Sequence, residues 1–389
     1  MKTKALLAKR TETLTDTAVI EILKAAADPT IISFAGGVPA PATFPIEKLK
    51  QAAVSVLEKY GEKGLQYQPT QGVSQLLETL ANYLSKKWGK KIKPENILAT
   101  SGSQQAIDLL GKTFINPSDT VIVERPSYFV ALQAFSAYNP KFVEINFADN
   151  QLDLKKLEKT LKKEKPKLVY LNPSFQNPTG QSLSIKQRRQ IAKLSRKYPK
   201  TLFLEDTAYT DLYFEKAYAD IIKFSSKIIH LGTFSKILSP GLRLGYIVGP
   251  KNIIYNLTLV KQSADLHTNS LSQLIVNEIL SDKHWFKNHL KKIRAFYENQ
   301  AKTMDKILVK NMPDSVLWNK SKGGLFFWLN TKVDTKKIYP EAIKQRIAFV
   351  PGHVFFAKKP PHNFMRLSFA TASKEEMEKG IKKLGRLLI

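Results

Sequence analysis

Residues 232–246 read Gly-Thr-Phe-Ser-Lys-Ile-Leu-Ser-Pro-Gly-Leu-Arg-Leu-Gly-Tyr, and the interpretation of the whole chain depends on them. The stretch places Lys236 among hydroxyls and glycines, with Arg243 further along. Lysine is normally exposed, so a lysine flanked by apolar side chains needs an explanation. A desolvated lysine has a lowered pKa and can attack a carbonyl to form a Schiff base. A lysine on the rim of a loop is the other explanation, and the stretch alone leaves both open.

Around this stretch, apolar runs alternate with amphipathic segments. Strands are expected at 97–100, 121–124, 142–145, 167–172, 201–206 and 228–232. Helices are expected at 104–114 and from Ser184 onward, where Gln187 would complete a capping box. This alternation predicts an α/β fold with a mostly parallel, doubly wound sheet that carries helices on both faces.

The segments before and after this alternating part show a different order of helices and strands. Amphipathic helices are expected at 13–27, 46–60 and 73–88, and helical periodicity runs from about 268 to 311. Strands at 325–329 and 365–369 and a last helix capped by Ser373 and Glu376 indicate a smaller α+β domain. The expected divisions are an N-terminal arm and helix that belong to the small domain (1–45), a large domain (46–280) and a small C-terminal domain (281–389).

Composition excludes several classes of protein. The chain has 389 residues and no cysteine, which excludes disulfides, thiolate metal sites and a cysteine nucleophile. No metal site is expected. The N-terminal apolar patch is too short for a secretory signal, and no apolar run approaches the roughly 18 residues that span a bilayer. We therefore expect a cytoplasmic protein without a membrane partner.

The formal net charge of +28 raises the question of a nucleic-acid partner. The lysines are spread along the chain, and the densest run, 155–167, is interrupted by leucines and glutamates at helical spacing. Neither zinc-finger spacing, an RNA-recognition motif nor a helix-turn-helix is evident. The pattern favours a positive field that attracts anionic cofactors and substrates over nucleic-acid binding.

Polar residues follow several of the expected strands, at the edge where open α/β sheets bind ligands. Ser103 and Gln104 lie in a small-residue turn at a helix start, which presents free N–H groups to a phosphate. The turn lacks the lysine of a Walker loop and the glycines of a dinucleotide fingerprint. Asn177 lies in a loop after another strand, and Asp206 ends a third, with Tyr209 close behind.

Each of these residues also has a plain structural reading. Asp206 could cap a turn, and Tyr128 could be an ordinary core or rim tyrosine. Gly36 and Gly37 could form a turn or let the backbone approach a ligand. Arg366 stands inside an apolar strand, where a guanidinium is costly unless it meets an anion, so either an internal salt bridge or a ligand is expected there.

Taken together, these groups are what pyridoxal phosphate chemistry needs. A lysine forms the imine, a carboxylate keeps the pyridine nitrogen protonated, and cations with helix N–H groups hold the phosphate. A second arginine binds an amino-acid carboxylate through two hydrogen bonds.

Seven motifs in order between residues 34 and 370 carry a family resemblance: FAGGVPAP, LQYQPTQG, SGSQQA, PSFQNPTG, EDTAY, GTFSKILSPGLRLGY and NFMRLSFA. With them the chain resembles the fold-type I pyridoxal-phosphate enzymes of the class I/II aminotransferase family. Within that family it is similar to the branch of 2-aminoadipate and kynurenine aminotransferases, which includes the catalytic domains of GntR-type regulators. The resemblance implies a seven-stranded-type sheet and a homodimer with active sites at the subunit interface.

The resemblance also implies a role for each site residue. Lys236 would be the Schiff-base lysine and proton shuttle, Asp206 would pair with the pyridinium nitrogen, and Tyr209 with Asn177 would bind the ring oxygen. Tyr128 would stack on the ring, and Tyr67 would reach the phosphate of the partner subunit. Arg366 would bind the substrate carboxylate beside Asn177 and the Gly37 backbone. The phosphate would be held by Ser103, Gln104, Thr233, Ser235 and Arg243.

The implied reaction is ping-pong transfer of an amino group between an L-amino acid and a 2-oxo acid such as 2-oxoglutarate. Some relatives bind acidic side chains through an arginine on the N-terminal helix, but here that helix carries Val19, Ile20 and Glu21. Aromatic and aliphatic amino acids are therefore at least as compatible as 2-aminoadipate. Two alternatives stay open: a pyridoxal-phosphate-dependent β-lyase, and a non-catalytic, DNA-associated relative of the regulators. The second loses its DNA-reading domain, since the chain begins directly with the arm.

Overall fold

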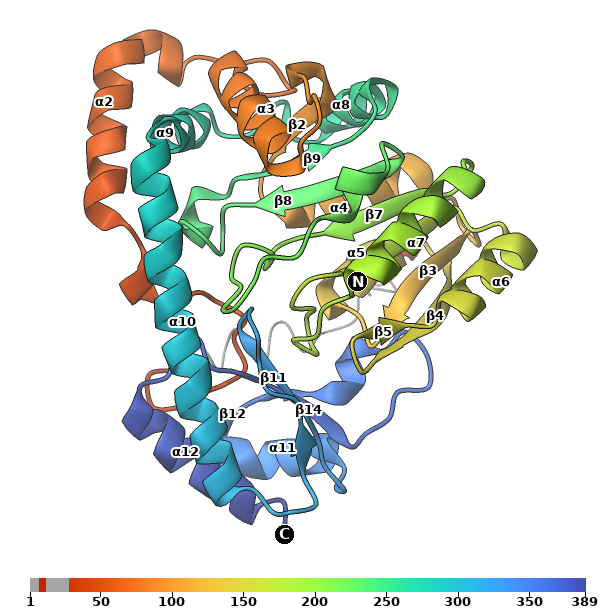
Figure 1. Cartoon of the computed structure of the whole chain (residues 1–389), viewed down its shortest axis with the longest axis vertical. Coiled ribbons are helices and arrows are strands. Elements are labelled where there is room, and N and C mark those ends of the chain that lie inside the picture. Colours follow the sequence, from red (N-terminus) through yellow and green to blue (C-terminus); the bar gives the residue numbers. More distant parts are fainter. Residues whose placement is uncertain (1–6, 12–27) are drawn as a thin grey trace.

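The fold is built on one large sheet, which runs across the upper part of Figure 1, in a computed structural model that describes residues 7–11 and 28–389. The helix expected at 13–27 lies outside the described residues. The sheet has eight strands, in the order β2 (Ile97–Thr100), β9 (Gly245–Val248), β8 (Ile228–Thr233), β7 (Leu202–Asp206), β6 (Leu168–Leu171), β3 (Thr120–Arg125), β4 (Lys141–Ala148) and β5 (Gln151–Leu152).

The central pairs are parallel, from β8 through β7, β6 and β3 to β4, whereas β9 runs antiparallel to both of its neighbours. The mostly parallel sheet is confirmed, with the two-residue β5 added at one edge. Every residue of β2, β6, β8 and β9 is buried, which explains why these strands appear in the sequence as continuous apolar runs.

Helices cover both faces of the sheet, as expected for a doubly wound fold. One apolar layer contains Leu110 of α4 (Ser103–Phe114), Leu132 of α5 (Phe129–Ser136) and Leu257 of α8 (Lys251–Asp265). The other face is covered by α3 (Ser74–Trp88), α6 (Leu154–Glu164) and α7 (Ile185–Lys197). Outside them, α2 (Ile46–Leu65) packs on α9 (Ser270–Ser281).

A small antiparallel sheet lies below the large one in Figure 1, in the order β10 (Leu317–Trp318), β11 (Phe326–Asn330), β14 (Phe364–Ser368) and β13 (Val350–Pro351). Beside it lie α11 (Thr335–Lys344), α12 (Lys374–Arg386) and the lower part of α10 (Lys283–Asn311). The short β1 (Ile32–Ser33) pairs with β12 (Ile347–Ala348), which ties the N-terminal segment to the small domain.

Two local expectations need correction. Ser184 caps α7 by accepting from the Gln187 backbone N–H at 3.3 Å, but the Gln187 side chain bonds to both backbone groups of Leu152 and completes no capping box. The helical segment from 268 to 311 is two helices, α9 and α10, because Asp282 between them accepts from the Trp285 N–H and starts α10 afresh. The capping box of Ser373 and Glu376 on α12 is confirmed.

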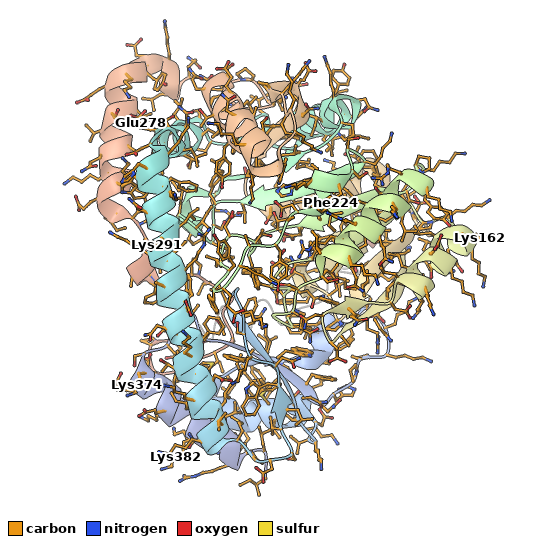
Figure 2. All side chains as sticks on the ribbon, viewed as in Figure 1. Lys162, Phe224, Glu278, Lys291, Lys374 and Lys382 are labelled. Atoms are coloured by element: carbon orange, nitrogen blue, oxygen red, sulfur yellow. The ribbon has the colours of Figure 1, made fainter. Side chains whose placement is uncertain are left out.

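The basic side chains are distributed over the outer helices. Figure 2 shows Lys162 on α6, Lys291 on α10 and Lys382 on α12, on well-separated parts of the surface. Across the described residues, the helices are all too short or too polar to cross a membrane.

Candidate active site

A cavity of about 320 Å³ lies at the carboxyl ends of β7 and β8, between the large sheet and the small domain. It is lined by all of the predicted site residues except Tyr67, namely Gly37, Ser103, Gln104, Tyr128, Asn177, Asp206, Tyr209, Thr233, Ser235, Lys236, Arg243 and Arg366. The structure thus brings together side chains that the sequence separates by hundreds of positions.

Lys236 lies in the turn that follows β8. Its apolar neighbours Phe234, Ile237 and Leu238 are buried in the core, which leaves the lysine side chain directed into the cavity. Nζ donates to the Gly37 carbonyl at 2.8 Å. Burial, together with the charges of Arg366 and Arg243, lowers the pKa of Lys236 to about 8. Of the two explanations for this lysine, the exposed rim of a loop is excluded.

Asp206 ends β7, and its buried side chain forms part of the cavity wall. The Tyr170 hydroxyl donates to Oδ2 at 2.7 Å, and the Ala208 N–H donates to Oδ1 at 3.3 Å. Asn172 Nδ2 donates to the Asp206 carbonyl at 2.8 Å and fixes the strand end. Burial raises the pKa of Asp206, whereas the Tyr170 hydrogen bond and the charge of Lys236 act in the opposite direction.

Tyr170 and Asn172 are site residues that the sequence analysis missed. Tyr170 stands on β6 and Asn172 just after it, and the β6–β7 register places them beside Asp206. The only signal in the sequence is a tyrosine inside an otherwise apolar strand, and a tyrosine there is common in protein cores.

The turn between β2 and α4 offers hydrogen-bond donors to the cavity. Gly102 has a φ of 81°, and a Cβ there would lie 2.9 Å from Arg243 Nη2. A Cβ on Gly245 would lie 2.9 Å from the backbone N of Ser103. Because both glycines leave this space free, the N–H groups that begin α4 and the Arg243 guanidinium lie against one region of the cavity. This donor set fits a phosphate.

Arg366 projects from β14 and is buried to 2% exposure. Its guanidinium donates to Asn177 Oδ1 at 2.7 Å and to the Ala35 carbonyl at 2.6 Å, while Nε has no partner among the described residues. Burial lowers the pKa of Arg366 to about 10.

The internal salt bridge considered for Arg366 is not present within residues 7–11 and 28–389, since its described partners are an amide and a carbonyl. Instead the guanidinium stacks on Phe326, with Cζ 4.3 Å from the ring centroid. Because this buried cation has only neutral partners, an anionic ligand could offset the cost of its desolvation.

Tyr209 and Tyr128 form two aromatic walls of the cavity. The Tyr209 ring is buried and meets Phe326 edge-on at 5.4 Å, and the ring of Tyr128 is half-buried. Burial raises the pKa of both hydroxyls above the ordinary value, so both carry their protons at neutral pH.

Tyr67 lies outside this cavity. Its side chain is 76% exposed on the loop after α2 and meets the His267 ring edge-on at 5.8 Å. Leu65 and Leu266 are also exposed large apolar side chains, which gives the loop region an apolar surface.

Comparison with known proteins agrees with this geometry. The family model "Aminotransferase class I and II" matches residues 29–384. Aromatic-amino-acid aminotransferase 1 of Thermococcus litoralis is 39% identical over 95% of this chain and 90% of its own length. The kynurenine aminotransferase of Pyrococcus horikoshii has 38% identity and a TM-score of 0.94, over 100% of this chain and 98% of that one.

The alpha-aminoadipate aminotransferase of Thermus thermophilus, solved with N-(5'-phosphopyridoxyl)-L-leucine, has 36% identity and a TM-score of 0.92, over 100% of this chain and 98% of that one. Its ligand is a phosphopyridoxyl group joined to an amino acid. The cavity described above offers groups that fit both parts: an anion site at α4 for the phosphate and a buried guanidinium for the carboxylate. The cofactor is pyridoxal 5'-phosphate, and the chain belongs to the class I and II aminotransferase family.

Proposed function

We propose that this pyridoxal-phosphate-dependent aminotransferase moves an amino group between an L-amino acid, aromatic, aliphatic or 2-aminoadipate-like, and a 2-oxo acid such as 2-oxoglutarate. The observation that carries the proposal is one cavity in which Lys236, Asp206 and Arg366 meet an anion site. Relatives named for aromatic amino acids, kynurenine and aminoadipate support this range of substrates.

Each residue then has a task. When bound, pyridoxal phosphate supplies an aldehyde and a protonated ring that accepts electrons from the substrate. Lys236 would hold the cofactor through Nζ, and its free amine would be the base that takes the proton from the substrate Cα. Its pKa of about 8 makes the free amine accessible near neutral pH.

The remaining groups bind and orient. Asp206 would keep a proton on the ring nitrogen, Tyr209 and Asn177 would donate to the ring oxygen, and Tyr128 would stack on the ring. Arg366 fixes the substrate carboxylate with Asn177 and the Gly37 backbone alongside. The phosphate is bound by Ser103, Gln104, Thr233, Ser235 and Arg243, which line one cavity with the other groups.

The lining of the cavity bears on the side-chain preference. Lys236, Arg243 and Arg366 are the cations among the described lining residues, and each already has a task. Val38, Phe129 and Val130 add apolar surface. This distribution favours aromatic and aliphatic side chains over acidic ones.

We also infer a cytoplasmic homodimer without a nucleic-acid partner, in which Tyr67 binds the phosphate of the partner subunit's site. The exposed Leu65, Tyr67 and Leu266 support an interface on this side of the molecule. The proposed domain boundaries stay at 1–45, 46–280 and 281–389. The pairing of β1 with β12 and the start of α10 at Lys283 support them.

A panel of amino donors tests the proposal. The purified protein should show the visible absorbance of bound cofactor, and Lys236→Ala should lose it. An amino acid should convert the spectrum to that of the amino form of the cofactor, and a 2-oxo acid should reverse the change. Release of pyruvate and ammonia without conversion would identify a β-lyase instead. An unaltered spectrum in Lys236→Ala would refute the lysine assignment, and salt-sensitive retention of DNA would contradict the absence of a nucleic-acid partner.

A further inference from the structure

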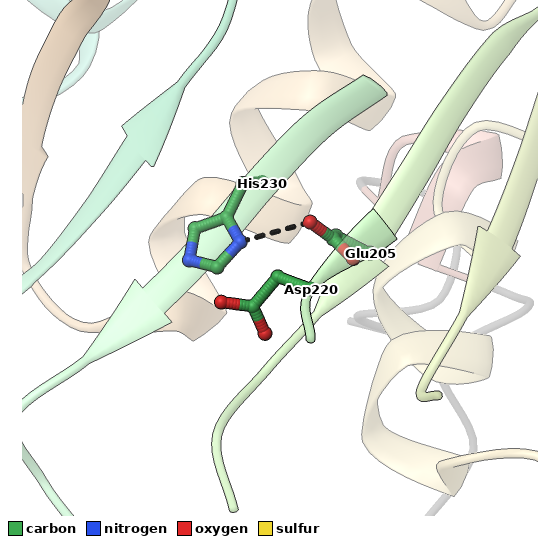
Figure 3. Close-up of side chains that lie close together, drawn as sticks. All are labelled: Glu205, Asp220 and His230. Carbon is green, nitrogen blue, oxygen red and sulfur yellow. Dashed lines mark hydrogen bonds and ion pairs between the residues drawn. The ribbon is translucent and has the colours of Figure 1, made fainter. Parts of the chain in front are cut away.

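Behind the cavity, three buried titratable side chains meet that the reaction above does not use. Glu205 lies on β7 next to Asp206, His230 lies on β8, and Asp220 precedes the short helix η5 (Ile221–Phe224). Their ligand atoms lie within 4.8 Å of one another, and each side chain is 1% exposed (Figure 3).

The hydrogen bonds of this cluster identify a network of side chains rather than a cation site. Glu205 Oε2 accepts from the Ile221 N–H at 2.6 Å, and Oε1 accepts from the Ile222 N–H at 2.9 Å. Asp220 Oδ2 accepts from Trp88 Nε1 at 2.8 Å and lies 3.6 Å from the Lys87 ammonium. A lysine cation already faces the carboxylate that a metal ion would need.

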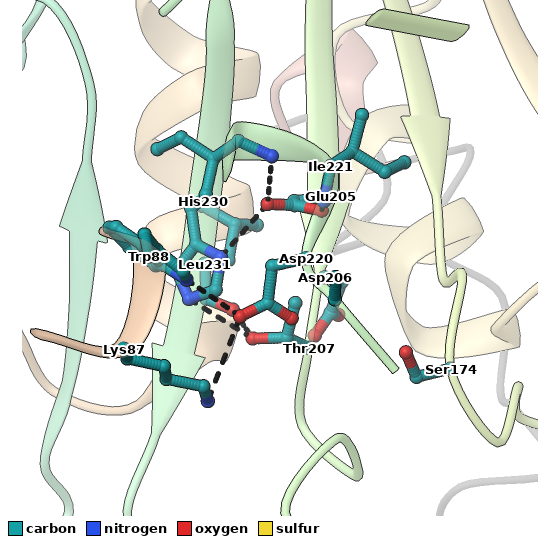
Figure 4. Close-up of polar contacts among 12 residues, drawn as sticks. Lys87, Trp88, Ser174, Glu205, Asp206, Thr207, Asp220, Ile221, His230 and Leu231 are labelled. Atoms are coloured by element: carbon teal, nitrogen blue, oxygen red, sulfur yellow. Dashed lines mark hydrogen bonds and ion pairs between the residues drawn. The ribbon is translucent and has the colours of Figure 1, made fainter. Parts of the chain in front are cut away.

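His230 is the centre of the network (Figure 4). Its Nδ1 lies 3.1 Å from Glu205 Oε1, an oxygen that already accepts a backbone N–H. Its Nε2 lies 3.2 Å from Thr207 Oγ1, whose own proton is donated to the Leu231 carbonyl at 2.8 Å. Both partners are thus placed to act as acceptors, and a ring that donates to both carries a proton on each nitrogen.

The two acceptors flank Asp206 in the chain. Side chains alternate along a strand, so Glu205 and Thr207 point to one face while Asp206 points to the other. Asp206 lines the cavity, and Glu205 and His230 do not. His230 therefore binds both neighbours of Asp206 from the side away from the ligand.

We propose that His230 is a positioning residue for Asp206: as a buried imidazolium it fixes the strand end through Glu205 and Thr207 and keeps the Asp206 carboxylate ionised toward the ring nitrogen of the cofactor. The inference rests on the role proposed above for Asp206. Burial raises the pKa of Asp206, and the His230 charge counteracts this rise.

The charged surroundings agree with a cation at His230. The anions that face it are Glu205 and Asp220, with Asp206 beyond the strand, and Lys87 on α3 is the cation paired with Asp220. Two aromatic rings enclose the imidazole: Trp88, edge-on at 4.8 Å, and Tyr246, stacked at 6.0 Å. The two rings exclude water from the imidazole.

The first test needs no variant. Selective ¹⁵N-histidine labelling of the wild-type apo-protein allows the side-chain nitrogens of His230 to be observed by NMR, with assignment by His230→Gln. Two protonated ring nitrogens are expected at neutral pH. A single protonated nitrogen at neutral pH overturns the proposal, whatever the role of Asp206.

The second test uses holoenzyme loaded with cofactor that is ¹⁵N-labelled in the ring. His230→Gln should retain the fold and the bound cofactor but lose the ring-nitrogen proton at a pH at least one unit lower than wild type, and kcat should fall about tenfold or more. The matched control is His353→Gln, because His353 lies in the small domain outside the cavity lining. In this variant the ring nitrogen of the cofactor should lose its proton at the same pH as in wild type. Wild-type titration in a folded His230→Gln overturns the proposal.

Asp206→Asn separates this inference from the proposed function. If the ring nitrogen stays protonated in Asp206→Asn, the role proposed for Asp206 is wrong. If the proton is lost there but kept in His230→Gln, only the inference about His230 fails.

Discussion

The cavity around Lys236 and the cluster around His230 both bury charged side chains at the same strand ends, but their charges are satisfied differently. In the cavity, Arg366 and Lys236 donate to an amide and to carbonyls, and no carboxylate is described as a partner of either. In the cluster, Lys87 lies 3.2 Å from Asp211 and 3.6 Å from Asp220.

This difference separates charged residues that can bind a ligand from charged residues that hold the backbone in place. Buried charges that lack a counter-charge carry a desolvation cost that a ligand of opposite sign can offset. Buried charges that are already paired gain nothing from a ligand and serve to hold the backbone in place. In this molecule Arg366 is of the first kind and faces the cavity, and the pair of Lys87 with Asp220 is of the second kind and lies one strand face behind it.

Removal of the cavity lysine should have the largest effect. Lys236→Ala should lower kcat by about four orders of magnitude or more, as loss of an essential covalent group does. Single-turnover measurements with a good amino donor would show the loss, and circular dichroism would verify the fold. A kcat within tenfold of wild type would show that Lys236 is not essential to the reaction, and it would contradict the assignment of the cavity as the binding region.

Removal of the cluster lysine should affect stability instead. Lys87→Met leaves the buried Asp220 without its cation, so the free energy of unfolding should fall by about 3–5 kcal/mol. Denaturant titration measures this loss. The KM for the amino donor should stay near the wild-type value, and a large rise in KM with unchanged stability would show that Lys87 belongs with the binding groups.

The cavity arginine should give the reverse result. Arg366→Gln should lower kcat/KM by roughly 150-fold, about 3 kcal/mol, because the substrate carboxylate loses a buried charged partner. Stability should change little or even rise, since a buried cation with neutral partners is removed. The cofactor absorbance serves as the control. A kcat/KM for the amino donor that is unaffected by this change would place the substrate carboxylate elsewhere.

The smallest effect concerns pH. Burial lowers the pKa of Lys236 to about 8, so its neutral fraction should rise roughly fivefold between pH 7 and pH 8. Burial alone would lower the pKa of Lys87 too, but Asp211 and Asp220 raise it well above its ordinary value. Labelling of apo-protein lysines by an amine-directed reagent, read by mass spectrometry, should therefore follow this rise at Lys236 and leave Lys87 unmodified. Equal labelling of Lys236 and Lys87 would contradict the difference between the cavity and the cluster.

The predictable part of the site was its list of strand-end residues. Lys236, Asp206 and Ser103 each follow an apolar run that could be recognised locally, and the sheet rule brings such ends together. The fold class followed from the same alternation, and the cap of α12 from its own residues.

The unpredicted part depends on register and on distant partners. Tyr170 reaches Asp206 because β6 pairs with β7, and His230 reaches Glu205 because β7 pairs with β8. Gln187 has a spacing that suits a capping box, yet a backbone from a neighbouring strand offers it better partners. Local patterns do not encode which strand will lie alongside, so these contacts become visible only in the folded chain.

The hydrogen bonds of Arg366 also bear on when the enzyme becomes competent during synthesis. Its guanidinium joins Asn177, 189 positions earlier, and the carbonyl of Ala35, 331 positions earlier. Contacts that span most of a chain form late, because the intervening loop must first be closed. A ribosome-bound chain that has already folded the large sheet would thus have Lys236 and the phosphate-binding turn, but it would lack Arg366 to bind the substrate carboxylate. The order of synthesis itself would keep the unfinished enzyme from acting on substrate.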